Sequence, residues 1–352
     1  MFNPTVKILA FYDYTGRAWW HRLHNIRRFL PSHIVLDIKE VYESFNCGSY
    51  DYFLLLEAYL LPLIQFLPPQ QIIAGSSCAR IADNAAQALA KQKCRALVFN
   101  SMEMYASAGG LPAMYCCQNG VDEELFVPAA DCPQEFTACW IGNSNSIGKK
   151  GLEIIQVACA QTGVRLLFRD ESREKTPLPH AKVRDNYYRQ SSVYICASMW
   201  EGTPNPALEA LSCGVPVIST PVGNMPELLR DGYNGFLVKR DAASIAAALR
   251  KIRDMDQQTL AVNARQSILD GWTWKQQTQK YAAMFQALAR EDRLGECQRE
   301  TAPHGYLQHM FRSGCKSLAS GHALDAAERL SWAVRYTPFF RAIRHLKICM
   351  KK

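Results

Sequence analysis

The chain has few of the features that mark secreted, membrane-spanning or zinc-binding proteins. It contains no apolar run of the ~20 residues that a transmembrane helix needs. The start, MFNPTVKILAFYDY, lacks a basic region followed by an apolar signal-peptide core. The 13 cysteines include no C-x-x-C pair, so the sequence implies neither a disulfide framework nor a zinc site. We therefore expect a protein of the reducing cytoplasm.

Positive charges exceed negative charges only moderately. The chain has 40 Lys and Arg against 32 Asp and Glu, a formal net charge of +8, and 48% of its residues are hydrophobic. This composition is typical of a globular protein. Basic residues gather in 17–28 and in 335–352, and no nucleic-acid-binding motif accompanies them. We expect an anionic membrane surface as a partner and no nucleic acid.

The most informative stretch that is present is SMWEGTPNPALEALSCGVPVISTPVGNMPELLRDGYNGFLV, residues 198–238. It follows the apolar run VYICA, which is typical of a buried parallel strand. Gly202 and Pro204 then break the chain, and Pro206 starts a helix with proline in its first turn. A second apolar strand, VPVIST, comes next. Strand, loop, helix and strand in this order predict an α/β fold with a doubly wound parallel sheet, which binds ligands at the carboxyl ends of its strands.

Two glutamates in this stretch have the chemistry of a nucleotide-sugar site. Glu201 lies in the loop at the end of the strand, and Glu209 lies in the first turns of the helix. Unpaired amides at a helix start suit a diphosphate, and a carboxylate can accept two hydrogen bonds from a ribose or hexose diol. The alternative is structural: Glu201 would cap the helix and Glu209 would be solvated.

This stretch resembles the retaining glycosyltransferases of family 4, which have the GT-B fold of two Rossmann-like domains facing a cleft. The similarity rests on EGTPNPALEALSCGVPV and GNMPELLRDGYNGFLV, with seven residues between the glutamates, and extends over roughly residues 117–290. It implies that Glu209 holds the ribose hydroxyls and Glu201 the donor-sugar hydroxyls. It also implies that amides of the 203–208 loop contact sugar and phosphate.

Two further segments complete the expected donor site. Gly16 follows the first strand where the family carries a glycine loop near the phosphate, although any such turn can need a glycine. Lys150 matches the family's phosphate-binding lysine, whereas Asn143 stands where the family has arginine. The alternative for the lysine is a solvated side chain. The expected catalytic residues are Glu201 and Lys150. The expected donor-binding residues are Gly16, Asn143, Lys150, Glu201, Gly202, Thr203, Asn205, Ala207, Leu208 and Glu209.

The first half shows the strand candidates VKILAFY, HIVLDI, DYFLLLEAY, QQIIAGSS and RALVFNS, with one helix after the first strand and one before the last. Many members of the family place a histidine after a middle strand of this half. The corresponding loops here contain none, so Glu57 or a loop serine takes its place, or positioning alone suffices. YCCQNGVDEELFVP resembles the family's crossover into the second half.

We expect four segments: residues 1–128 as the N-terminal acceptor domain, 129–271 as the nucleotide-sugar-binding domain, 272–295 as a helix that crosses back, and 296–352 as a helical extension. The extension has the spacing of one tetratricopeptide-like hairpin. Its end, PFFRAIRHLKICMKK, either lies in a membrane interface or is a packed helix with a basic tail.

The resemblance implies an enzyme that moves a sugar from a UDP- or GDP-sugar to a glycan or lipid-linked acceptor, without a cofactor or metal. We expect it to build lipopolysaccharide, capsule or a similar surface glycan in the cytoplasm, peripheral on the inner membrane face. The alternative is a GT-B-fold scaffold that binds sugar nucleotides and has lost catalysis. A third alternative is a sugar phosphorylase or an epimerase of the same fold.

Overall fold

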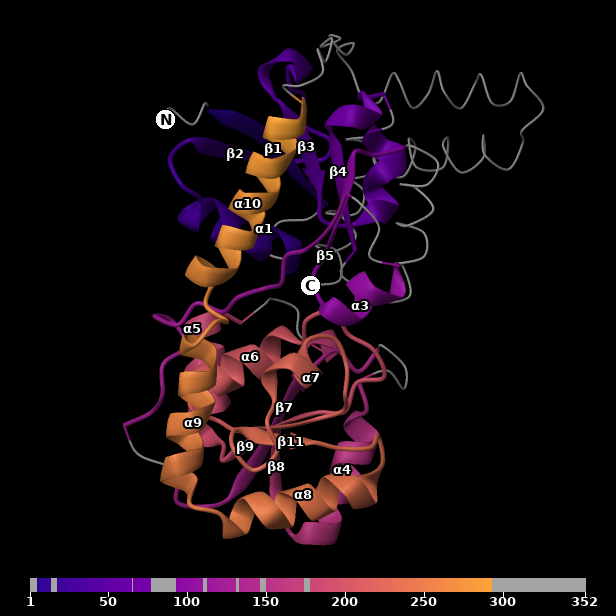
Figure 1. Ribbon diagram of the computed structural model, residues 1–352. Helices are drawn as coiled ribbons and strands as arrows, with labels where there is room; N and C mark the ends of the chain where they lie inside the picture. Colours follow the sequence, from indigo (N-terminus) through magenta and orange to yellow (C-terminus); the bar gives the residue numbers. More distant parts are fainter. Residues whose placement is uncertain are drawn as a thin grey trace, which may run out of the picture.

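The computed structural model of the protein describes residues 5–13, 18–64, 66–76, 93–109, 113–130, 133–145, 150–173 and 178–292. Gly16 and the expected extension, 296–352, lie outside these ranges. The described chain forms two parallel sheets in two lobes, one above the other in Figure 1. The predicted α/β class with two Rossmann-like halves is therefore confirmed. No helix within the described ranges is long and apolar enough to cross a bilayer.

The first sheet is six-stranded, with the order β2-β1-β3-β4-β5-β6 and parallel pairing throughout. Its strands are β1 (Val6–Tyr12), β2 (Ile34–Glu40), β3 (Tyr52–Leu55), β4 (Ile72–Ser76), β5 (Ala96–Phe99) and β6 (Met114–Cys116). Its described helices are α1 (Ala18–Phe29) and α3 (Met102–Ser107), with short 3-10 turns at Cys47–Ser49, Ala58–Ile64 and Pro69–Gln71. The helix predicted before the RALVFNS strand lies outside the described residues. The central strands are buried along their length, as continuous apolar runs predict.

The strand β6 corrects the predicted order of the first half, which ended at β5. β6 has only three residues, and Tyr115 and Cys116 within it are only half-buried. Such a short strand has no periodicity to reveal it, and its residues fall in the segment that the sequence assigns to the crossover.

The second sheet is five-stranded, with the order β11-β10-β9-β7-β8, also parallel. Its strands are β7 (Thr137–Gly142), β8 (Arg165–Asp170), β9 (Val193–Cys196), β10 (Val217–Ser219) and β11 (Gly235–Leu237). Its helices are α4 (Leu152–Thr162), α5 (His180–Asn186), α6 (Asn205–Ser212), α7 (Met225–Leu228), α8 (Ala242–Asp254) and α9 (Gln257–Leu269), with 3-10 turns at Glu171–Arg173 and Tyr188–Gln190. β7 and β9 lie at the centre, so the loops that follow them share one edge of the sheet.

The last described helix, α10 (Trp274–Asp292), returns to the first lobe, where it lies beside α1 and β1 in Figure 1. Its Tyr281 is fully buried and accepts a hydrogen bond from Arg22 Nε at 3.0 Å. Arg22 also donates to the carbonyl of Cys117 at 3.1 Å. The guanidinium thus joins α1, the start of the crossover and α10.

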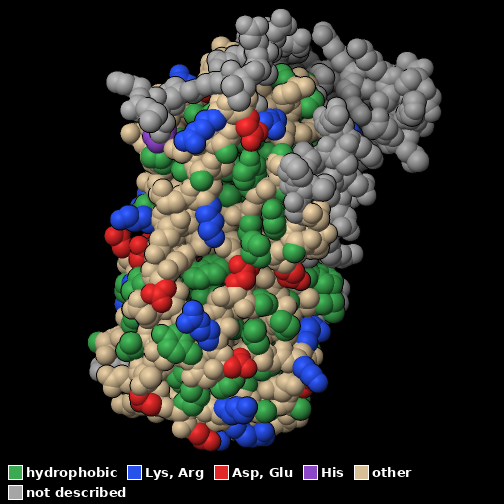
Figure 2. Space-filling view, viewed as in Figure 1, with side chains coloured by type: hydrophobic (Ala, Val, Ile, Leu, Met, Phe, Trp, Pro, Cys, Tyr) green, Lys and Arg blue, Asp and Glu red, His purple; other side chains and the backbone are tan. Residues whose placement is uncertain are grey.

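The basic cluster expected at 17–28 is only partly a surface feature. Arg22 is 3% exposed, and Arg28 forms ion pairs with Asp122 and Glu124 at 2.9 Å. Figure 2 shows basic and acidic side chains interspersed over the described face. These pairs reduce the positive field that the sequence predicts for this region.

Candidate functional site

The loop that follows β9 is held at the edge of the second sheet by two glycines. Gly151, at the start of α4, has φ +69°, and a Cβ there would overlap the carbonyl oxygen of Ala197. Gly223, before α7, has φ +56°, and a Cβ there would overlap the carbonyl oxygen of Gly202. Only glycine adopts these conformations at this distance without strain. The loop from 197 to 202 is therefore clamped from both sides.

This clamp brings Lys150 against the first of the two predicted glutamates. The Lys150 ammonium forms an ion pair with Glu201 Oε1, and Ser198 Oγ donates to the same oxygen at 2.7 Å. The Glu201 side chain is 14% exposed and that of Lys150 33%. Burial opposes the charge on Lys150, but the Glu201 carboxylate outweighs it and raises the pKa of Lys150. Two residues that lie 51 positions apart thus form one charged centre.

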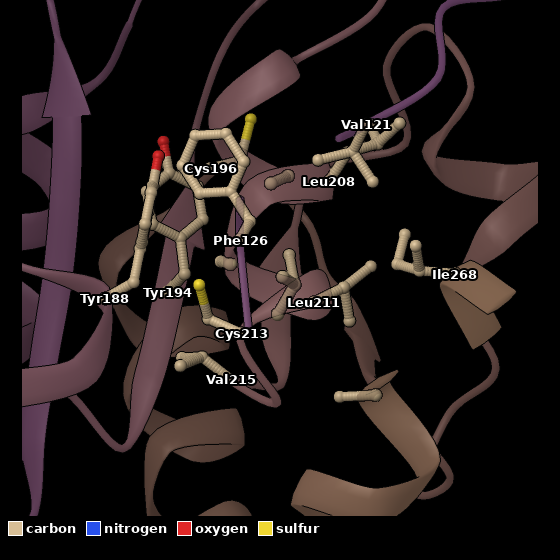
Figure 3. Close-up of a cluster of buried hydrophobic side chains, with 14 of the residues drawn as sticks. Val121, Phe126, Tyr188, Tyr194, Cys196, Leu208, Leu211, Cys213, Val215 and Ile268 are labelled. Atoms are coloured by element: carbon tan, nitrogen blue, oxygen red, sulfur yellow. The ribbon is translucent and has the colours of Figure 1, made fainter. Parts of the chain in front are cut away.

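The second glutamate lies in α6 and forms a separate hydrogen-bonded group. Glu209 Oε2 accepts a hydrogen bond from the Tyr188 hydroxyl at 2.6 Å. Loss of water around the carboxylate raises the pKa of Glu209 to about 7, although the Tyr188 hydrogen bond opposes this. In Figure 3 the Tyr188 and Tyr194 rings lie side by side with their hydroxyl oxygens at the same end. A carboxylate of this kind changes its charge near neutral pH.

Asp170, at the carboxyl end of β8, organises the adjoining loop. It accepts hydrogen bonds from the amide of Ser144 at 3.0 Å and from the amide of Ser172 at 3.1 Å, and from both hydroxyls. Burial alone would raise the pKa of Asp170, but these hydrogen bonds outweigh it and hold the pKa well below its usual range. Asn143 is exposed beside this anchor, and its side chain accepts from the amide of Asn145 at 3.0 Å. Asn143 therefore shapes the turn.

The start of α6 differs from the expected open set of amides. The amides of Ala207 and Leu208 donate to the Pro204 carbonyl at 2.9 and 3.4 Å, and the Asn205 amide donates to Thr203 at 2.9 Å. The side chains of Ala207 and Leu208 are buried in the core of the second lobe. These three amides are engaged within the turn, so a phosphate bound there has to compete with the carbonyls of Thr203 and Pro204.

The same loop touches the first lobe. Thr203 Oγ1 donates to the carbonyl of Asn100, after β5, at 3.1 Å. Asn119 Nδ2 donates to Asn205 Oδ1 at 2.9 Å. The two lobes thus meet over the loop through a small number of polar contacts.

Within the described ranges neither polar atom of the buried Asn224 side chain has a hydrogen-bond partner.

A second contact between the lobes lies on the Glu209 side. The rings of His21, from α1, and His180, at the start of α5, lie 4.7 Å apart between centroids. Burial lowers the pKa of His180, and the charge of Arg169 lowers it further. Neutral imidazoles can stack in this way, whereas two imidazolium rings would repel.

The predicted residues therefore fall into distinct groups. Lys150 and Glu201 meet directly, Gly202 and Thr203 lie in the same loop as Glu201, and Asn205 begins α6. Glu209 belongs to a separate group, in which it accepts a hydrogen bond from Tyr188. Sequence reasoning missed Ser198, Tyr188 and Arg169. Arg169 is the penultimate residue of β8, so its place near the carboxyl end of a strand was the available signal.

An Asp-x-Asp sequence, a pattern whose two carboxylates can hold a metal ion, occurs once, at residues 254–256. It lies at the junction of α8 and α9. Asp256 accepts a hydrogen bond from the amide of Thr259 at 3.1 Å and so caps α9. Hydrogen bonds from Thr259 lower the pKa of Asp256. Asp256 therefore has a structural role as a helix cap.

A comparison with known proteins finds its match in the segment that carries Glu201 and Glu209. The family model described as Glycosyl transferases group 1 matches residues 176–254, which include both glutamates. The D-inositol 3-phosphate glycosyltransferase of Geodermatophilus obscurus is 33% identical over 116 residues, covering 33% of this chain and 25% of that protein. The matched stretch thus spans about a quarter of that relative.

Solved structures extend the likeness to most of the chain. Sucrose-phosphate synthase from Thermosynechococcus elongatus matches with a TM-score of 0.66 at 14% identity, covering 81% of this chain and all of that one (100%). Anabaena HepE in complex with UDP and glucose matches with a TM-score of 0.62 at 16% identity, covering 80% and 100%. At this identity the likeness establishes the fold, which is GT-B as predicted. The resemblance to the glycosyltransferases is confirmed in the second half.

Proposed function

We propose that the protein is a retaining glycosyltransferase that moves a sugar from a nucleotide-diphosphate sugar to a glycan or lipid-linked acceptor. The observation that carries this is the pair of carboxylates at one sheet edge: Glu201 beside Lys150, and Glu209 beside Tyr188. One is suited to sugar hydroxyls beside a cation, and the other to ribose hydroxyls. HepE, which shares the fold, was crystallised with UDP and glucose, which supports a nucleotide-sugar donor.

In the proposed reaction the bond between the anomeric carbon and the phosphate oxygen breaks. A new bond forms on the same face between that carbon and an acceptor hydroxyl oxygen. The acceptor proton passes to the departing phosphate. Lys150 stabilises the charge that develops on the diphosphate, and Glu201 orients the sugar. Donor binding would loosen the ion pair, because the phosphate and the Glu201 carboxylate compete for one ammonium.

The test is incubation with UDP- and GDP-sugars, measuring release of free nucleotide and the anomeric configuration of the product. Release with retained configuration supports the proposal. Binding of UDP or GDP without turnover, with any acceptor supplied, favours the scaffold alternative, and Asn143 motivates that alternative because it is an exposed turn residue where the family has arginine.

We further propose a peripheral position on the cytoplasmic face of a membrane, in synthesis of a bacterial surface glycan. The support is the sequence of 338–352, in which Phe339, Phe340 and Ile343 alternate with basic residues. Liposome co-sedimentation with and without residues 338–352 tests this. Equal pelleting of both forms on anionic vesicles at low salt would overturn it.

A further inference from the structure

A cavity of about 590 Å³ lies at the amino-terminal ends of strands of the second sheet, away from the loop that carries Glu201. Ser191 and Val215, which line it, come just before β9 and β10, whereas Glu201 comes after β9. Figure 3 shows Tyr188, Cys213 and Val215, three of its buried lining residues. Small-molecule sites in proteins have volumes of about 300–1,000 Å³, so this cavity is large enough for a ligand separate from the donor.

The walls of the cavity are mostly apolar and open to solvent. They include Pro128 and Ala130, at the end of the crossover, and Ala261 and Val262, from α9. Val262 is 63% exposed, and Pro128 and Ala130 are exposed as well. A ligand can therefore enter from solvent, and most of its body has to be apolar.

Two arginines, Arg189 and Arg265, give the cavity a positive charge. Arg265 Nη1 donates to the carbonyls of Phe126 and Ser212, each at 2.9 Å, and its Nη2 donates to that of Glu123 at 2.8 Å. Carbonyl oxygens hold a guanidinium in place without neutralising its charge, and burial lowers the pKa of Arg265. Among the described residues Arg265 Nε has no acceptor, so one donor remains for a ligand.

Arg189 is held in the same way, with one acid nearby. Its Nε and Nη2 donate to the carbonyls of Val127 and Pro128, both at 3.1 Å. Its Nη1 pairs with Asp185 at 2.9 Å, and Asp185 also pairs with Arg184 at 2.8 Å. In the described part of the chain, the three arginines of this region therefore share ion pairs with a single carboxylate. The region has an excess of positive charge, which complements an anion.

We propose that this cavity is a second ligand site, for a small molecule with an apolar body and one oxyanionic group, a carboxylate or a phosphate. Guanidinium groups bind both kinds of oxyanion through charge-assisted hydrogen bonds. The apolar body lies against the proline and alanine walls, and the oxyanion lies at Arg265. Tyr188, which lines the cavity, donates to Glu209 at 2.6 Å, so an occupant contacts the hydrogen-bond partner of that carboxylate.

The first experiment adds octanoate or octyl phosphate to protein with ¹³C-labelled alanine methyl groups and follows the signals by NMR. The signals of Ala129, Ala130 and Ala261, which line the cavity, should shift with an affinity of about 1 mM or tighter. Octanol, which has the same body without the charge, should bind about 10-fold more weakly. Shifts with either anion support the inference and identify the group that is bound. No shift with either anion, or octanol binding as well as both, would overturn it.

The second experiment changes the charge at the opening of the cavity. Val262→Glu should weaken octanoate binding about 5-fold or more, whereas Val262→Lys, at the same exposed position, should keep or strengthen it. Val157→Glu, at a 49%-exposed valine of α4, is the control and should change nothing. Equal losses in the two Val262 variants would mean that the cavity binds through apolar contact alone, against the inference.

A third measurement removes the guanidinium itself. Arg265→Met should weaken octanoate binding about 10-fold, whereas Arg250→Met, which removes an exposed cation from α8, should not. Equal binding by Arg265→Met and wild type would overturn the role of this arginine. Arg265→Met also withdraws support from the crossover, so the Val262 variants decide the question of charge if it does not fold. UDP should leave octanoate bound, and competitive displacement by UDP would place the probe in the donor site, against a second site.

Discussion

Glu103 and Glu227 each cap the helix of the opposite lobe. Glu103, in the first turn of α3, accepts a hydrogen bond from the amide of Gly223 at 2.9 Å, just before α7. Glu227, in the first turn of α7, accepts from the amide of Met102 at 3.2 Å, at the start of α3. The exchange has the reciprocity of a capping box, but between two domains rather than within one helix.

This exchange predicts a latch between the lobes. Glu227 also accepts from Gln118 Nε2 at 2.6 Å, and Gln118 accepts from Lys280 of α10 at 2.7 Å, so the contact extends to the returning helix. The double variant Glu103→Ala and Glu227→Ala removes charge-assisted hydrogen bonds, each contributing about 1 kcal/mol at an exposed site. We expect a larger radius of gyration in solution scattering and a higher KM for donor. Glu153→Ala, an exposed glutamate of α4, is the control. Identical scattering from the double variant and wild type would show that the two carboxylates do not hold the lobes together.

Glu209 should make nucleotide binding depend on pH. Its pKa is raised to about 7, so its carboxylate gains a proton as the pH falls through neutrality and then accepts hydrogen bonds less strongly. UDP affinity should fall below pH 7 in the wild type. Glu209→Gln should weaken binding by about 1.5–3 kcal/mol at pH 8 and abolish the pH dependence. Calorimetry at pH 6, 7 and 8 measures both, and an unchanged affinity would remove Glu209 from the ribose site.

The same carboxyl should also affect stability, with a defined sign. An acid whose pKa rises on folding from 4.5 to about 7 binds more protons in the folded state between those values. The free energy of unfolding should therefore fall as the pH rises from about 4.5 to 7 and then level off. Glu209→Gln should remove this slope and raise the melting temperature at pH 8. A variant that melts lower than wild type at pH 8 would contradict the raised pKa.

Much of the fold was accessible from sequence because its signals are local. Apart from the exposed Lys7, VKILAFY is apolar on both faces, as ALVF is, and this is typical of a parallel strand that is covered on both sides. The helix α8 repeats its apolar residues at helical spacing behind an Asp241 cap. β6 was missed because three residues carry no period.

The candidate site, like the fold, was predicted from the sequence only in part. Lys150 and Glu201 were predicted from motif spacing, and the structure brings them together. The latch was not predicted, because its partners lie in different lobes and depend on how the sheets and lobes are ordered. Spacing within the EGTPNPALE motif also could not reveal that the amides of α6 bond to Pro204.

Lys150 should act on turnover more than on binding. Negative charge grows on the diphosphate as the sugar leaves, so a cation beside it stabilises the transition state more than the bound donor. Lys150→Met should lower kcat by about 100-fold with a smaller change in KM. It also leaves the 14%-exposed Glu201 side chain without its cation, so Lys150→Met with Glu201→Gln should be more stable to heat than Lys150→Met alone. Lys182→Met, at an exposed lysine of α5, is the control. Turnover within a few fold of wild type would assign the charge to another residue.

The two glycines that flank α4 allow the loop clamp to be tested separately from backbone strain. Gly151 and Gly163 have nearly equal φ values of +69° and +65°, so alanine at either position costs about 1–2 kcal/mol for the left-handed conformation. At Gly163 nothing lies within 4 Å of the added Cβ, whereas at Gly151 it meets Ala197. Gly163→Ala should therefore lose stability only, and keep wild-type kcat once folded. Gly151→Ala should lose more stability and also most of its turnover, because Lys150 is pushed away from Glu201. Chemical denaturation with steady-state kinetics on both variants measures this, and equal kcat in the two would show that the close packing at Ala197 does not position Lys150.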